Sequence, residues 1–130
     1  MMPEISGWIN KAEGDWGTLL REHSITINPN LDAVCFHAQQ CAEKYLKARL
    51  TEAGIEFRKT HDLTYLYELV LQAEPKWTFL KFGLSDLNAF AVASRYPGLD
   101  ANQEQAERAV EYCRVIRITV RMWCDLPSDD

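Results

Sequence analysis

The chain has 130 residues, 47% of them hydrophobic and 25% charged, and its formal net charge is −5. A chain of this length makes one domain and buries enough apolar surface to fold without a metal ion or a disulfide. The charge excludes a general nucleic-acid coat protein, because such proteins need an excess of Lys and Arg to neutralise phosphates. Any RNA contact would be local, and a small-molecule or protein partner fits the charge equally well.

The segment from Met1 to Gly14 shows no basic stretch followed by an apolar run, which argues against a signal peptide. No stretch approaches the ~20 apolar residues of a membrane span, so we expect a cytoplasmic protein without a membrane contact. The cysteines lack the C-x-x-C spacing of a zinc site. We therefore expect reduced, mostly structural thiols, no metal site and no cofactor; the cysteines are Cys35, Cys41, Cys113 and Cys124.

Apolar residues recur at intervals of three and four along most of the chain, which predicts helices. The first helix is expected from about Pro3 to Glu22, with Glu13 and Asp15 on the side away from its apolar face. Pro29 breaks the pattern, and the asparagine on either side of it can cap the next helix. This second helix runs from about Leu31 to Ala53, and Gly54 suits a left-handed residue just past its end.

The second helix has two faces by its sequence pattern. Small and apolar side chains face inward, among them Ala38, Cys41, Ala42 and Tyr45, and the other face carries His37, Gln40, Glu43, Lys44 and Lys47. Phe36 falls on this polar face. It indicates a dimer or partner surface, with a solvated face bearing one isolated aromatic as the alternative.

Thr60 or Asp62 can cap a short third helix that ends near Gln72, and His61 between them is expected to make a structural hydrogen bond. A fourth helix is expected from Trp77 to Ala91, and Gly83 is expected to bend or split it. Asp100 is expected to cap the fifth helix, which reaches Trp123, with Gln103 at the reciprocal position. The predicted fold is all-α: an up-and-down antiparallel helical bundle of four main helices plus one short helix, in a domain over residues 1–125 with a short acidic tail at 126–130.

Arginines stand at two places where a phosphate could bind. Arg114, Arg117 and Arg121 form a stripe near the end of the fifth helix, where the helix dipole alone can account for basic residues. A phosphate-binding stripe is the alternative. Arg95 closes the fourth helix, where it can bond the last carbonyls or present its guanidinium to a phosphate.

Three blocks in the middle of the chain carry a family resemblance. They read Phe36-His37-Ala38-Gln39-Gln40-Cys41-Ala42-Glu43-Lys44-Tyr45-Leu46-Lys47-Ala48, then Thr60-His61-Asp62-Leu63, then Leu87-Asn88 through Ser94-Arg95-Tyr96-Pro97. In this order they resemble the F-x-A-Q-Q-A-x-E-K-x-L-K-A, T-H-x-L and L-N…A-R-Y-P signatures of the HEPN domain family. Cys41 and Ser94 each stand where the family usually has Ala.

The resemblance implies a helical bundle that forms homodimers and often partners a small nucleotidyltransferase encoded next door, in a toxin–antitoxin or stress module. Some members are RNases that carry Arg, then four to six intervening residues, then His, near the start of the last long helix. No His follows Arg95 or any later Arg here, so an enzyme is not favoured and no catalytic residue is assigned. The resemblance implies ligand binding by polar groups of the second helix and the Arg95 turn, namely His37, Gln40, Lys44, Lys47, His61, Asn88, Arg95 and Tyr96.

Three functions remain as hypotheses. The first is a non-catalytic, homodimeric subunit that binds a nucleotide or nucleotide-like ligand and partners a nucleotidyltransferase. The second is a metal-independent RNase that uses Arg95 with a non-standard histidine, such as His37 or His61 from across the dimer. The third is a purely structural interaction module with Phe36 and the second helix as its interface.

Overall fold

A computed structural model of the chain describes residues 1–93 and 95–126. Within these residues the chain forms helices and no strand, so the predicted all-α fold is confirmed. The helices are α1 (Pro3–His23), α2 (Leu31–Ala53), α3 (Leu63–Ala73), the 3₁₀ turn η1 (Trp77–Leu80), α4 (Lys81–Ala93) and α5 (Gln103–Trp123). Ser94 of the third signature block and residues 127–130 of the expected tail lie outside the described residues. None of the described helices is long and apolar enough to cross a membrane.

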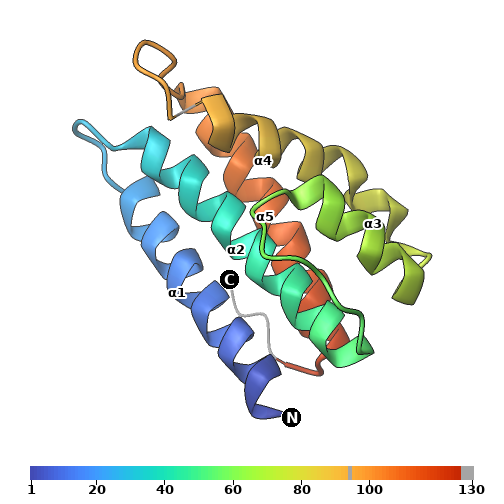
Figure 1. Ribbon diagram of the computed structural model, residues 1–130. Helices are drawn as coiled ribbons and strands as arrows, with labels where there is room; N and C mark the ends of the chain where they lie inside the picture. Colours follow the sequence, from blue (N-terminus) through green and yellow to red (C-terminus); the bar gives the residue numbers. More distant parts are fainter. Residues whose placement is uncertain (94, 127–130) are drawn as a thin grey trace.

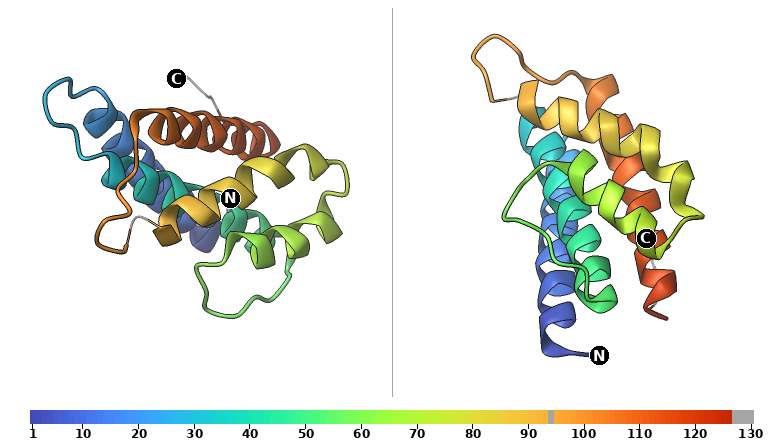
Figure 2. Two further views of the ribbon diagram at one scale, coloured as in Figure 1. Left: turned by 90° about the horizontal axis from the view of Figure 1, so that it is seen from above. Right: turned by 45° about the vertical axis from the view of Figure 1, so that its right-hand side comes forward.

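The helices pack as a bundle around α2, which contacts α1, α3, α4 and α5 (Figure 1). The four main helices α1, α2, α4 and α5 alternate in direction, as the sequence pattern predicted. The short α3 instead runs in the same general direction as α2, because the connection over residues 54–62 returns along α2 before α3 begins. Two further views show that α4 lies between α3 and α5 (Figure 2).

Local signals fix the starts and ends of the helices. The side chain of Asn30 accepts from the Ala33 amide at 3.0 Å, and Asp62 caps α3 in the same way. Gly54 ends α2 in the left-handed conformation at φ 70°, as predicted. The predicted cap of α5 was two residues early: Asn102, not Asp100, begins the helix, and Gln105 completes the capping box.

The predicted fourth helix is divided, but not at its glycine. The 3₁₀ turn η1 ends at Leu80 and α4 begins at Lys81, while Gly83 lies within α4. A side chain at Gly83 would meet the ring of Tyr112, because a Cβ built there lies 3.0 Å from Tyr112 Cδ1. Gly83 therefore permits α4 and α5 to approach closely and does not bend the helix.

The prediction that α2 has one buried and one exposed face holds only in part: Phe36 is exposed, and His37, Gln40 and Lys44 are half-buried. Glu43 and Lys47, expected outside, are instead buried, at 2% and 5% exposure. Glu43 and Lys47 are buried because the connection over residues 54–62 and the helix α3 lie over this part of α2, while α1 and α5 pack against its apolar side. Polar side chains can be buried in this way when each one finds a partner.

Two acidic residues of α1 and one arginine of α5 were also misplaced by the pattern. Asp15 is buried rather than exposed, and the Arg117 guanidinium is only 3% exposed. Arg117 donates from Nε and Nη2 to the two carboxylate oxygens of Glu13, each at 2.8 Å. The alternative of a phosphate-binding stripe therefore does not fit, because Arg117, the middle arginine of the three, is buried in an ion pair between α1 and α5.

The Glu13 carboxylate is the centre of this ion pair. Burial raises the pKa of Glu13, but the hydrogen bonds from Arg117 and from the Tyr45 phenol lower it by more than burial raises it. The pKa therefore lies below its ordinary value. Arg121 reaches the same group, donating to the Tyr45 hydroxyl at 3.3 Å. The cluster joins α1, α2 and α5 through charged hydrogen bonds, which are stronger than neutral ones.

The four cysteines are free thiols, as expected. Burial raises the pKa of Cys35 to about 11 and that of Cys41 well above its ordinary value. Because the thiolate is the reactive form, these side chains act as small apolar groups in the core.

Replacing Glu13 by Gln is expected to lower the free energy of unfolding at neutral pH by about 3 kcal/mol, because it leaves the Arg117 guanidinium buried without its carboxylate. Folding lowers the pKa of Glu13. The extra free energy of unfolding of the wild type over the variant is therefore fully present above pH 4.5, the ordinary pKa, and is lost as the pH falls through the pKa of the folded state. Urea unfolding across this pH range measures both effects.

The matched control is Glu104→Gln, which removes a surface carboxylate that accepts from Arg108 at 2.6 Å within α5. It should change stability by less than about 0.5 kcal/mol. Equal losses for the two variants would contradict the importance of the Glu13 cluster.

Candidate functional site

Three polar residues of α2 share one face because they are spaced four apart: Gln39, Glu43 and Lys47. All three are buried, and their side chains contact residues 60 and 61 of the 54–62 connection. Lys47 Nζ donates to Glu43 Oε2 at 3.0 Å and to the Thr60 carbonyl at 2.9 Å. The charges of Glu43 and Lys47 therefore compensate each other, and Lys47 also holds the 54–62 connection against α2.

Two aromatic rings enclose the Lys47 ammonium. Nζ lies 5.3 Å from the centroid of the Trp8 ring and 5.8 Å from that of Phe57. Both distances suit cation–π attraction, which is strongest when the cation is removed from water. Lys47 was predicted as an outward ligand-binding residue, whereas its ammonium is taken up by these contacts and by Glu43.

His61 lies at the exposed end of the same network. Its Nδ1 is 2.9 Å from Glu43 Oε1, and its backbone carbonyl accepts from Gln39 Nε2 at 2.7 Å. The His61 side chain is 64% exposed, whereas that of Glu43 is 3% exposed. Because a carboxylate only accepts hydrogen bonds, Nδ1 is the donor in this contact, and the other ring nitrogen, Nε2, takes no part in it. The prediction that His61 makes a structural hydrogen bond is confirmed.

The start of α3 and the middle of α4 are joined through one amide. Asn88 Oδ1 accepts from the Leu63 amide at 3.1 Å, and Asn88 Nδ2 donates to Asp62 Oδ1 at 3.3 Å. The Asp62 carboxylate also caps α3 by accepting from the Thr64 amide at 3.0 Å. Asn88 thus fixes the His61–Asp62 segment against α4, which accounts for its place in the third signature block.

A hollow of about 240 Å³ opens at this junction, between α2, the start of α3 and the end of α4. It is lined by Gln39, His61, Asp62, Asn88, Ala91, Val92 and Arg95. Arg95 is exposed, and among the described residues its side chain forms no hydrogen bond or ion pair. The hollow therefore combines an oriented imidazole with an available guanidinium, two groups suited to a phosphate.

The eight predicted site residues divide into groups. His61, Asn88 and Arg95 line the hollow, and Gln40 reaches it through one hydrogen bond from its Nε2 to Gln39 Oε1 at 2.8 Å. Tyr96 is 58% exposed and does not line the hollow.

The other predicted residues of α2 face α1. His37 Nδ1 and Lys44 Nζ lie 2.8 and 2.5 Å from the two carboxylate oxygens of Asp15. This Asp15 cluster is a separate, partly buried set of ion pairs. The structure therefore does not bring His37 and Lys44 together with Arg95.

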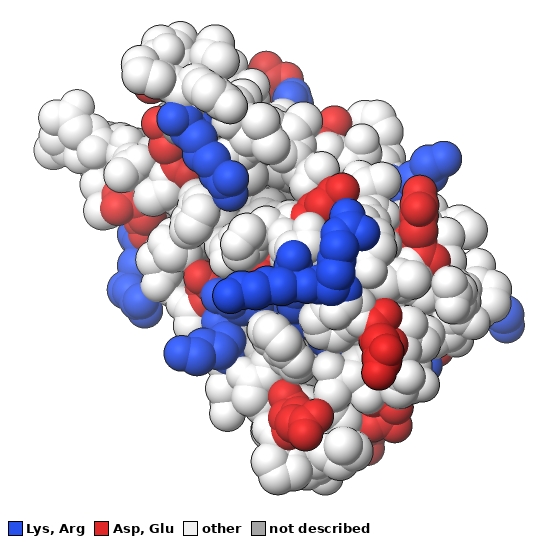
Figure 3. Space-filling model, in the orientation of Figure 1, with Lys and Arg blue, Asp and Glu red and all other residues white. Residues whose placement is uncertain are grey.

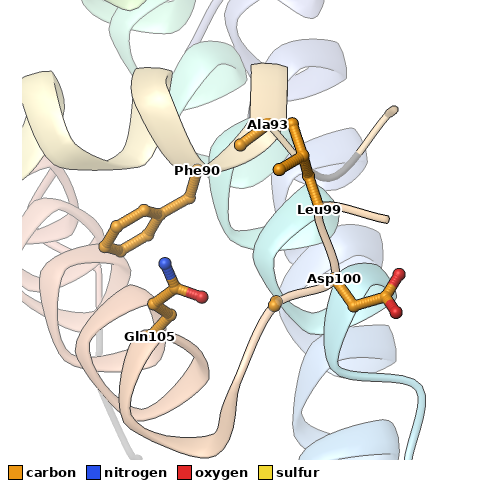
Figure 4. A pocket seen from close by; sticks show the side chains of 6 residues that line it. Phe90, Ala93, Leu99, Asp100 and Gln105 are labelled. Carbon is orange, nitrogen blue, oxygen red and sulfur yellow. The ribbon is translucent and has the colours of Figure 1, made fainter. Parts of the chain in front are cut away.

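A second, smaller hollow of about 130 Å³ lies between the end of α4 and the start of α5. Figure 4 shows Leu99 beside Ala93 and Phe90 pointing toward Gln105. The amide of Gln105 accepts from the Asn102 backbone as part of the capping box. This hollow is a gap in the packing of the connection that bears Tyr96, and it offers no cation to a ligand.

Basic side chains are grouped locally although the chain is acidic overall. On the face shown in Figure 3, Lys and Arg side chains gather in front of α2, between α1 and α3, and acidic side chains surround them. This distribution agrees with the inference from composition that any nucleic-acid contact is local. Among the described residues no three His, Cys, Asp or Glu side chains come together as a metal site would require.

Gln39, Asp62 and Glu43 are site residues that the sequence pattern did not indicate. All three belong to the signature blocks, so the blocks themselves were the available signal. The pattern puts Glu43 on an exposed face, six residues from His37 and poorly placed to pair with it. Its partner is His61, 18 residues away in the chain, and only the fold brings the two together.

These elements define a small helical-bundle domain whose second helix, third-helix cap and fourth-helix end meet at one polar hollow. Residues 5–123 of the sequence match the HEPN domain family. The chain therefore belongs to the HEPN domain family, and the resemblance seen in the three blocks is confirmed. No curated protein and no solved structure matched the chain.

Replacing Lys47 by Met should lower the free energy of unfolding by about 3 kcal/mol, because it leaves the Glu43 carboxylate buried without its ammonium. Lys11→Met, at an exposed position of α1, is the control and should change it by less than about 0.5 kcal/mol. Denaturant unfolding followed by circular dichroism measures both variants. An unchanged midpoint for Lys47→Met would show that the network adds nothing to stability.

Proposed function

We propose that the protein is a non-catalytic, homodimeric HEPN subunit that binds a nucleotide or nucleotide-like ligand through its phosphate. The observation that carries this proposal is the hollow that Arg95 and His61 both line. A guanidinium can bind two oxygens of a phosphate at once, and a ring of 64% exposure is accessible to a ligand. Val92 and Ala91 add an apolar wall against which a base or sugar can lie.

We further propose that the protein partners a small nucleotidyltransferase in a toxin–antitoxin or stress module of the cytoplasm. The family membership supports the first part, and the four free cysteines suit a reducing compartment. Co-expression with a nucleotidyltransferase encoded beside the gene tests this part. Failure of the two chains to co-purify would remove the partner from the proposal without affecting the phosphate site.

Arg95→Ala is expected to weaken nucleotide binding by about 10- to 100-fold, because a charge-assisted hydrogen bond contributes roughly 1.5–3 kcal/mol. Calorimetric titration with ATP, GTP and a short RNA measures the effect. Lys59→Ala removes an exposed cation from the nearby connection and should leave the affinity within about twofold. Absence of binding by the wild type, or unchanged binding by Arg95→Ala, would refute the phosphate site.

A second candidate function is metal-independent cleavage of RNA. The specific observation in its favour is that Glu43 orients His61 while Arg95 lines the same hollow. His61 Nε2 would take the proton of a ribose 2′-hydroxyl, whose oxygen would attack the adjacent phosphorus. The bond to the 5′-oxygen would break, that oxygen would take a proton from water, and Arg95 would stabilise the charge on the phosphorane.

If this second function holds, His61→Ala should slow cleavage by at least about 100-fold, which is the usual contribution of a general base. The products should end in a 2′,3′-cyclic phosphate, and a 2′-deoxy substitution at the cut should block the reaction. Lys59→Ala is again the control. Intact RNA after long incubation with wild-type protein, or full cleavage by His61→Ala, would leave binding alone as the function of the hollow.

A further inference from the structure

A group of exposed apolar side chains lies where η1 and the first turn of α4 face α5. Phe79, Phe82 and Met122 are 61%, 70% and 70% exposed, and Val115 is 39% exposed. We call these four residues the η1–α5 strip. None of them lines the hollow that holds Arg95, so the proposed phosphate site does not account for their exposure.

The η1–α5 strip has a ridge with a hollow on either side. A hollow of about 170 Å³ has walls that include Phe79, Phe82 and Val115. Another of about 440 Å³ has walls that include Phe79, Met122 and Trp77. Because Phe79 lines both hollows, its ring is the ridge between them. A surface that carries both projecting rings and hollows can interlock with a copy of itself, as a two-fold interface requires.

The Tyr112 ring, which forms the floor of the smaller hollow, is held in place by contacts within the chain itself. The ring of Tyr112 packs edge-on against Phe82, with centroids 6.1 Å apart, and its hydroxyl donates to Asp86 Oδ2 at 3.0 Å. Gly83 leaves room for this ring, since a Cβ there would lie 3.0 Å from Tyr112 Cδ1. Pre-organisation of this kind lowers the entropy cost of association.

The chemistry of the η1–α5 strip limits what can cover it. Among the residues that the structure describes, Glu74 is the one charged side chain that lines either hollow, and it accepts from Arg49 at 3.2 Å. A nucleic acid or a strongly charged protein would find no cation in the lining of either hollow; the exposed Lys76 and Lys81 lie outside both linings. A matching surface must be apolar and uncharged, and the strip of a second copy meets that requirement although each copy carries a net charge of −5.

The exposed area also suits self-association. Phe79, Phe82 and Met122 together present on the order of 400 Å² of apolar surface, since side chains of this size carry about 150–250 Å² each. Each partner contributes roughly 800 Å² to a standard interface, of which the centre is the most apolar part. The strip is thus large enough to form the centre, with the flanking polar residues as the rim.

We propose that two copies of this chain associate through the η1–α5 strip, with Phe79 and Phe82 of each copy seated against the hollows of the other. The inference rests on the homodimer of the proposed function and names its surface. It places the interface on η1, α4 and α5. The sequence pattern had pointed instead to Phe36 of α2, whose ring is 37% exposed and packs edge-on against His37.

Analytical ultracentrifugation of the full chain tests the proposal. The wild type is expected to be a dimer at micromolar concentration, and the double variant Phe79→Ser/Phe82→Ser should raise the dimer dissociation constant at least about 100-fold, as loss of central aromatic residues does. Met122→Lys should act in the same direction, because it places like charges across the two-fold. Phe36→Ser is the matched control and should change the constant by less than about twofold.

Circular dichroism melting of each variant shows whether it is folded, and all four substituted side chains are exposed. A wild-type monomer at high concentration would overturn both the strip and the proposed homodimer. A dimer that survives the strip variants, or one that Phe36→Ser disrupts, would overturn the strip alone. Nucleotide titration of the same variants reports separately on the Arg95 hollow, so failure of the phosphate site is distinguishable from failure of the interface.

Discussion

The burial of α2 on nearly all sides is the constraint on which the rest of the structure depends. A helix that contacts four others can carry polar residues only if each has a partner in the protein, because water cannot reach them. The Glu43–Lys47 ion pair satisfies this requirement within the helix itself. Lys47 also donates to the Thr60 carbonyl, and Glu43 also accepts from the His61 ring. These two hydrogen bonds fix the connection that leads into α3.

The same requirement produces a second polar cluster on the opposite flank. Glu13 of α1 and Arg117 of α5 pair across the bundle, and the Tyr45 phenol of α2 joins them. The two clusters have different consequences. The Glu13 cluster is closed and serves packing, whereas the Glu43 cluster ends at an exposed histidine beside an available arginine. Only the second has the exposure that binding or chemistry needs.

Local signals in the sequence were sufficient for the helices but not for the site. The period of three and four and the Asn30, Asp62 and Gly54 signals placed the ends of α2 and the start of α3, because caps act within one turn. The Glu43–His61 contact could not be derived this way. It depends on the path of the 54–62 connection, which covers a face that amphipathic periodicity alone describes as exposed.

The connection over residues 54–62 is held in an unusual manner: α2 donates to its carbonyl groups. Lys47 binds the carbonyl of Thr60, and Gln39 binds that of His61. A carbonyl is present whatever the side chain, so these two contacts depend on the residues of α2 and not on the side chains at positions 60 and 61. Position 59, whose side chain is exposed, can therefore vary over evolutionary time or be changed in a redesigned binding site while His61 keeps its place.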